Sequence, residues 1–365
     1  MHRNSRLPAL PAALRAAVCL AVAISCAVLS RPTVEAHKAI TSKYTYAEHV
    51  FPIVRDRCGA CHFPGGPAPM SLLSYKDAVP WAESIREQLT TEAMPPWFVD
   101  ATGPAIKGGH SLLNRELDVL VTWASGGTPE GDPSKVPPAT PPSADWAAGT
   151  PDQTFELPEV ALAPGMIEQK KEFSVATGFT RDTWVRGADA LPSERSMVRS
   201  VTVTVEGGPL LAAWVPGEAM APAPSGTAVK VPAHAVLKVA VHYRKNWQDE
   251  QVAKADRTRI GLYTTDEPVS GKGITTLQVT ETITLTAPAR ILAIRPLLDQ
   301  PLEAVAVEAT LPSGRKVSLL NLRAARPGWA RRYWLSEPVE LPAGTAVTVH
   351  VSGENPAVEL YTVGL

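Results

Sequence analysis

The chain has 365 residues, of which 45% are hydrophobic, and its length suggests two or three domains with ordinary cores. Its 35 basic and 36 acidic residues give a formal net charge of -1, so nothing indicates a nucleic-acid partner or a polybasic membrane contact. The 35 prolines indicate linkers and many strand-ending turns.

Residues 1–36 are typical of a secretory signal peptide. Basic residues precede an apolar run from Ala16 to Leu29, and Val34-Glu35-Ala36 forms a small-residue cleavage site. The run is short for a bilayer span, so we expect cleavage, no membrane span in the mature chain, and a periplasmic or otherwise exported protein. An uncleaved anchor helix and a lipid attached to Cys26 are the alternatives.

A C-x-x-C-H motif lies in the next segment, residues 37–127, as Cys58-Gly59-Ala60-Cys61-His62. This spacing is that of a c-type haem site, in which two thiols bond to the vinyl groups of one haem edge. Cys58 and Cys61 are then the covalent attachment points, and His62 is the proximal iron ligand. A disulfide scaffold or a zinc site would need further cysteines, and these two are the only ones left after signal cleavage. A redox dithiol would need a βαβ setting, which the sequence lacks.

The sixth iron ligand should be a thioether or a second imidazole. Met94 is the favoured candidate, because the prolines in Ala93-Met94-Pro95-Pro96-Trp97 fix the backbone around it. Met70, His110 and an open position are the alternatives. A His/Met pair would raise the iron potential, which suits accepting electrons from a periplasmic redox partner protein.

Helical periodicity frames the motif and predicts a small all-α, class I-type cytochrome c domain. Tyr46, Val50, Phe51 and Val54 recur at helical spacing before it. Residues 114–124 also have a helical pattern, which ends at Gly126-Gly127. Trp123 and Phe51 are expected to be core residues.

Residues 128–154 form a proline-rich linker, and beyond it the hydrophobic period changes from helical to two. β-Branched residues alternate at Val201, Val203 and Val205, and again in the segments 239–241, 305–307 and 347–351. Such short strands between Pro- and Gly-containing turns predict two jelly-roll-like β-sandwiches, at 155–266 and 267–365. The expected fold class is therefore multidomain α + β.

Several short motifs resemble those of a known bacterial family. They include Tyr44-Thr45-Tyr46-Ala47-Glu48-His49-Val50, Ser71-Leu72-Leu73-Ser74-Tyr75, Met94-Pro95-Pro96-Trp97, Gly131-Asp132-Pro133, Gly149-Thr150-Pro151-Asp152, Val215-Pro216-Gly217, Val241-His242-Tyr243 and Leu311-Pro312-Ser313-Gly314. Members of this family fuse a monohaem cytochrome c to a copper type II, ascorbate-dependent monooxygenase-like module, similar to peptidylglycine hydroxylating monooxygenase. The resemblance implies two jelly-roll-like sandwiches that each hold one copper ion.

Most copper ligands that this resemblance implies are replaced here. Arg199 and Ser200 occupy the positions of the family's adjacent histidine pair, and only His242 matches a ligand of that copper. The second copper's His-x-His would follow Ile294-Arg295-Pro296, where this chain has none, and its Met ligand has no counterpart. Copper needs several imidazoles at one point, and His234 and His242 on one strand would lie roughly 26 Å apart. We therefore expect no copper, with His242 as a core histidine or at most a residual ligand.

These observations predict an exported monohaem c-type cytochrome that transfers single electrons, with the β-rich module serving for docking and holding no catalytic residues. The first alternative is a copper-dependent monooxygenase-like enzyme that receives electrons from the haem. The second alternative is a haem-containing binding or sensing module with an open sixth position.

Overall fold

A computed structural model describes residues 41–97, 99–100, 102–108, 112–138, 140–218, 220–266, 273–329, 331–353 and 357–365. The expected signal peptide at 1–36 and the alternative ligand His110 lie outside these ranges. Residues from Thr41 to Leu365 form one compact unit. In the part of the chain that is described, no helix is both long enough and apolar enough to cross a bilayer.

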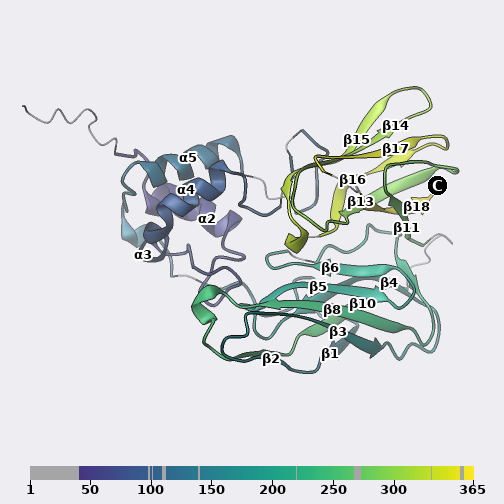
Figure 1. Cartoon of the computed structure of the whole chain (residues 1–365), viewed down its shortest axis with the longest axis horizontal. Helices are drawn as coiled ribbons and strands as arrows, with labels where there is room; N and C mark the ends of the chain where they lie inside the picture. Colours follow the sequence, from purple (N-terminus) through teal and green to yellow (C-terminus); the bar gives the residue numbers. More distant parts are fainter. Residues whose placement is uncertain are drawn as a thin grey trace, which may run out of the picture. The chain divides into compact units, whose positions relative to one another are not determined.

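The described α-helices lie between residues 51 and 125, and single helical turns also occur later in the chain, at Trp247–Asp249 and Pro327–Trp329 (Figure 1). A Ser74 side chain caps α3 by accepting the backbone N–H of Asp77, and Glu116 caps α5 by accepting the N–H of Leu113. Tyr46, Val50, Val54, Leu120 and Trp123 are all buried in one cluster, so the predicted helical faces are correct. The helix predicted at 114–124 is confirmed as α5. The helices are α2 (Phe51–Arg57), α3 (Tyr75–Ala78), α4 (Ala82–Thr90) and α5 (Asn114–Ser125), with single turns at Tyr46–Val50, Val79–Trp81 and Pro133–Lys135.

Antiparallel sheets occupy residues 153–264. One sheet has the order β1-β10-β4-β7, a second has the order β3-β8-β5-β6, and β2 pairs with β9. The alternation predicted at Val201, Val203 and Val205 is confirmed, because all three lie in β5 and are at most 4% exposed. The strands are β1 (Gln153–Glu156), β2 (Val160–Leu162), β3 (Glu168–Ala176), β4 (Thr183–Leu191), β5 (Val198–Val205), β6 (Leu210–Trp214), β7 (Val229–Val231), β8 (Val236–Arg244), β9 (Lys254–Asp256) and β10 (Arg259–Thr264).

Two further four-stranded sheets follow, with the orders β11-β18-β13-β16 and β12-β17-β14-β15. Both contribute to a single hydrophobic core that includes Ile291, Val307 and Val347. The strands are β11 (Thr275–Val279), β12 (Thr282–Thr284), β13 (Ala289–Pro296), β14 (Leu302–Thr310), β15 (Lys316–Ala325), β16 (Tyr333–Leu341), β17 (Ala346–Val351) and β18 (Val358–Gly364).

The predicted fold class is wrong: the chain is not a separate all-α class I-type cytochrome c domain followed by two jelly-roll-like sandwich domains. Of the described residues, 38% lie in strands and 16% in helices, and α5, the longest helix described, has 12 residues. The segment after α4 is built into the β core, because Ile106 is 9% exposed there and pairs with Leu335 of β16. Trp334 and Tyr361 from the later strands likewise enter the core of the earlier sheets. The helices keep a core of their own, but the loop between α4 and α5 belongs to the core of the later sheets, and all of these segments lie in one compact unit.

Candidate cofactor site

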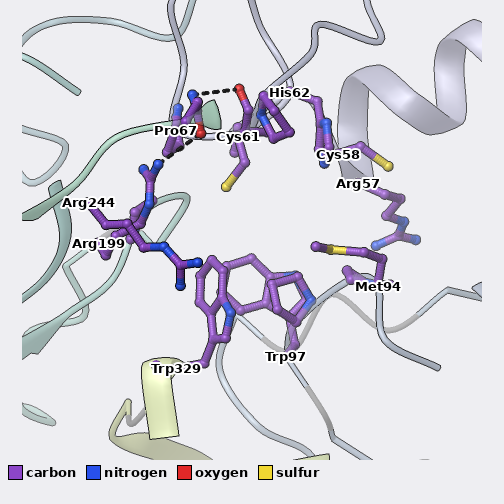
Figure 2. A pocket seen from close by; sticks show the side chains of 18 of the residues that line it. Arg57, Cys58, Cys61, His62, Pro67, Met94, Trp97, Arg199, Arg244 and Trp329 are labelled. Carbon is purple, nitrogen blue, oxygen red and sulfur yellow. Dashed lines mark hydrogen bonds between the residues drawn. The ribbon is translucent and has the colours of Figure 1, made fainter. Parts of the chain in front are cut away.

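A cavity of about 450 Å³ brings the sequence-predicted site residues together. Cys58, Cys61, His62 and Met94 all line it, and Figure 2 shows the sulfur atoms of Cys61 and Met94 directed into the same space. The volume lies in the range of cofactor pockets, about 300–1,000 Å³. The other lining residues are Arg57, Ala60, Pro67, Ala68, Pro69, Leu89, Pro95, Pro96, Trp97, Arg199, Pro216, His242, Arg244, Lys245, Asn246, Trp247, Gly328 and Trp329.

A tight turn after α2 positions the motif. The backbone N–H groups of Cys61 and His62 both donate to the carbonyl of Cys58, at 3.0 and 2.9 Å. A Cβ atom at Gly59 would lie 2.5 Å from the carbonyl oxygen of Arg55, so only glycine fits between the helix end and the turn. This close turn carries both thiols and the imidazole to one cavity wall.

The His62 ring is oriented by a backbone carbonyl. Its Nδ1 lies 3.1 Å from the oxygen of Met70, and as the carbonyl can only accept, Nδ1 carries the proton. Nε2 then has a free lone pair, the arrangement that metal-binding histidines use. Burial also lowers the pKa of His62, which keeps the ring neutral. Met70 contributes its carbonyl here, while its side chain packs against the helical core and is not among the cavity-lining residues.

The two thiols are free and protonated. Cys58 and Cys61 form no disulfide, and burial raises the pKa of each thiol to about 12. Catalytic and redox-active cysteines have lowered pKa values, because the thiolate is the reactive form. The environment therefore argues against a redox dithiol and suits sulfurs that end as neutral thioethers.

Met94 follows the end of α4, where its N–H donates to the carbonyl of Gln88 at 3.1 Å. Met94 is 37% exposed, and it lines the cavity. Trp97 lies a short way along the same loop, packs edge-on to Trp329 and lies beneath the guanidinium of Arg331, with 4.7 Å between Arg331 Cζ and the ring centroid. These rings form an apolar part of the cavity wall.

The β-sheets supply a wall that sequence reasoning missed. Arg199 lies at a bulge in β5, between Val198 and Ser200, and lines the cavity beside His242 and Arg244 of β8. In the sequence, Arg199 stands out only as the replacement of a copper ligand. Hydrophobic periodicity gives no sign of a bulge, so the sequence carried no signal that this side chain would reach the motif.

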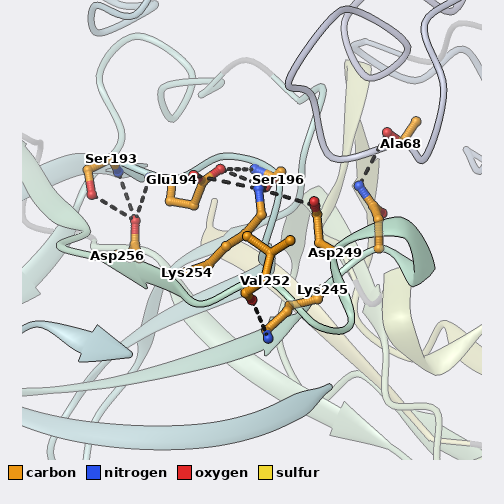
Figure 3. Close-up of polar contacts among 10 residues, drawn as sticks. Ala68, Ser193, Glu194, Ser196, Lys245, Asp249, Val252, Lys254 and Asp256 are labelled. Carbon is orange, nitrogen blue, oxygen red and sulfur yellow. Dashed lines mark hydrogen bonds and ion pairs between the residues drawn. The ribbon is translucent and has the colours of Figure 1, made fainter. Parts of the chain in front are cut away.

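A polar network holds the turn after β8 in place (Figure 3). The ammonium of Lys245 donates to the carbonyls of Ala163 and Val252, at 2.8 and 2.6 Å. On the far side of the turn, the amide groups of Asn246 and Gln248 donate to the carbonyls of Ala68 and Pro69, at 3.4 and 2.6 Å. The loop that follows His62 is thereby tied to the sheet that carries Arg199.

The proposed residual copper ligand His242 lies in the same cavity rather than in a site of its own. Its Nε2 is 2.7 Å from Oε1 of Glu168, an ion pair if the ring is protonated. His234 lies on a turn with a φ of 58°, and His350 lies on β17. Among the described residues, no three His, Cys, Asp or Glu side chains are grouped as metal ligands.

No family model and no curated protein matches the sequence. Among solved structures, the chain is similar to the crystal structure described as STIV MCP, with 12% identity over 58% of this chain and 96% of that chain and a TM-score of 0.23. It is similar to A223, a turret protein of Sulfolobus turreted icosahedral virus, with 10% identity over 58% and 99% and a TM-score of 0.18. It is also similar to a xanthan lyase of Paenibacillus, with 12% identity over 64% of this chain and 28% of that chain and a TM-score of 0.16. At such TM-scores the similarities carry no argument.

Proposed function

We propose that this chain is an exported electron-transfer protein with one covalent c-type haem. Cys58 and Cys61 attach the haem, His62 is its proximal ligand, and Met94 is its distal ligand. The observation that carries the proposal is that two thiols, an imidazole with a free Nε2 and a thioether border one cavity of about 450 Å³. Bonding the porphyrin through Cys58 and Cys61 fixes which imidazole meets the iron.

Several residues around the motif would help to hold the cofactor. The carbonyl of Met70 fixes the tautomer and orientation of His62, which makes the ring a better ligand. Leu89, Trp97 and Trp329 line the cavity and would give a bound haem apolar surroundings. A bound haem supplies a one-electron Fe(II)/Fe(III) couple, which an apolar site and a Met ligand shift to higher potential. Single-electron transfer needs no acid or base, so we propose no catalytic residue, and the partner is a redox protein outside the cytoplasm.

The test is to export the full chain together with the periplasmic haem-attachment machinery. The expected product is coloured, keeps its haem after denaturation, and contains one iron and no copper per chain. Colourless protein with both thiols free to alkylation would refute the proposal, and stoichiometric copper would favour the monooxygenase-like alternative.

Met94 is tested in the same material. Reduced wild-type protein should not bind carbon monoxide, whereas Met94→Ala should bind it, because the sixth position is then open. Met166 is a matched control, since it is 45% exposed and does not line the cavity. Rapid carbon monoxide binding by the wild type would instead favour the sensing alternative.

A further inference from the structure

Two arginines on the sheet wall of the cavity have no carboxylate within hydrogen-bond distance among the described residues. Arg199 comes from β5 and Arg244 from the end of β8, whereas the thiols come from the turn after α2. The function proposed for Cys58 and Cys61 involves only the vinyl groups of a haem and gives these two cations no role.

Arg199 is the better enclosed of the two. Its Nη2 donates to Oδ1 of Asn246 at 2.8 Å, while its Nη1 is buried and has no hydrogen-bond partner among the described residues. Burial and the neighbouring charge of Arg244 lower the pKa of Arg199 to about 10, so the group stays a cation at neutral pH. A buried N–H of a charged group without an acceptor is unfavourable, and an anionic ligand that accepts from it would remove this cost.

Arg244 is held only loosely by the protein. Its single ion pair, to Oε2 of Glu168, is long at 3.9 Å, and 59% of its side chain is exposed. Figure 2 shows its guanidinium directed toward the cavity, close to Trp329. It can therefore turn to a carboxylate at the cavity mouth without breaking a close contact.

The other basic side chains described at the cavity already have partners. Arg57 pairs with Glu116 at 3.0 Å, His242 bonds Glu168 at 2.7 Å, and the ammonium of Lys245 donates to backbone carbonyls. Arg199 and Arg244 remain as the donors for an anion among the residues described at this wall.

Haem bears two vinyl groups at one edge and two propionate carboxylates at the opposite edge. We infer that Arg199 and Arg244 bind these propionates, so that the β-sheets complete the haem site instead of serving only for docking. The inference rests on the proposed function. Guanidinium groups suit this role, because their fixed fork of donors matches a carboxylate bidentately.

The experiment uses exported, haem-loaded full-length protein as wild type, Arg199→Met, Arg199→Lys and Arg244→Gln. Arg290→Gln is the matched control, because Arg290 forms a solvent-exposed ion pair with Glu340 and does not line the cavity. Haem content is measured first, then the midpoint potential, then the carboxylate bands in the infrared difference between oxidised and reduced protein. The last readout reports the propionates directly and does not depend on activity.

Removing a positive charge beside the carboxylates disfavours adding an electron, so the midpoint potential should fall. For Arg199→Met we expect a roughly tenfold lower ratio of reduced to oxidised protein at a fixed potential, which is about 59 mV for one electron. The carboxylate bands should move as well. Arg244→Gln should change both readouts less, because Arg244 is more exposed, and Arg199→Lys should restore most of the potential but not the bidentate band position. Arg290→Gln should change nothing.

Wild-type potentials and carboxylate bands in both Arg199→Met and Arg244→Gln would overturn the inference and leave the proposed function standing. Wild-type protein without covalent haem would instead overturn the proposed function and the inference together. If Arg199→Met fails to fold, Arg199→Lys and Arg244→Gln decide, because unchanged infrared bands in both variants would sink the inference.

Discussion

Replacing Gly217 by alanine would push a methyl group against the sulfur of Cys61. Gly217 has a φ of 80°, a left-handed conformation that costs an L-residue about 1–2 kcal/mol. A Cβ atom there would lie 2.7 Å from Cys61 Sγ, which is well inside contact distance. Overpacking of this kind costs about 1–3 kcal/mol. The two effects together should lower the free energy of unfolding by about 2–5 kcal/mol.

Gly226 supplies the control that separates these effects. Its φ is 75°, but no atom lies within 4 Å of a Cβ built there. Gly226→Ala should therefore lower the free energy of unfolding only by the cost of the left-handed backbone conformation. We expect denaturant unfolding of the haem-loaded chain to show an extra loss of about 1–3 kcal/mol for Gly217→Ala, together with a lower yield of covalent haem. Equal losses and equal haem yields in the two variants would refute the close packing of the Gly217 turn on Cys61.

Three further predictions concern titratable groups. In folded, haem-free protein, Cys58 and Cys61 should be alkylated about a thousandfold more slowly than in urea at pH 8, because burial raises the pKa of each thiol from 9.0 to about 12; mass spectrometry measures this rate. Arg331→Met should lower the free energy of unfolding by about 3–5 kcal/mol, since it removes the buried partner 2.8 Å from Glu218; a loss below about 1 kcal/mol in urea titration would contradict this. Burial raises the pKa of Asp189 from 3.8 to about 6, so the native state holds a proton that the unfolded state has released, and stability should fall as pH rises from about 4 to 6. The variant Asp189→Asn should lack this dependence of stability on pH, and its free energy of unfolding should be about 3 kcal/mol higher than that of the wild type at pH 7. The same dependence of stability on pH in both proteins would argue against the raised pKa of Asp189.

Local patterns in the sequence predicted the local structure well. The helical spacing before the motif and the segment 114–124 correspond to buried helical faces, and period-two valines correspond to strands with buried alternate residues. These patterns depend on neighbours a few residues apart, which is the range over which periodicity carries information. The motif itself identified three cavity residues, and the proline-fixed loop identified Met94 as a fourth.

The fold class was wrong because periodicity does not tell which distant segments share a core. Val99 and Ile106 lie between two helices, a position that predicts a helical domain, yet they form bridges with Leu322 and Leu335. Isolated bridges of one residue leave no alternating pattern, so these contacts have no signature in the sequence. The same limit hid Arg199, whose direction depends on a one-residue bulge in β5.

The cavity walls come from segments far apart in the chain, and this has a consequence for how a haem could be attached. The space exists only after α2, the loop after α4 and the ends of β5 and β8 have come together. In that folded state both thiols are protonated, whereas adding a sulfur to a vinyl group needs a reactive sulfur that can reach it. Attachment should therefore precede closure of the β wall over Cys61. If the proposed haem is present, the Gly217 turn and Arg199 would then pack against a cofactor already in place, and the sheets would help to determine how tightly it is held.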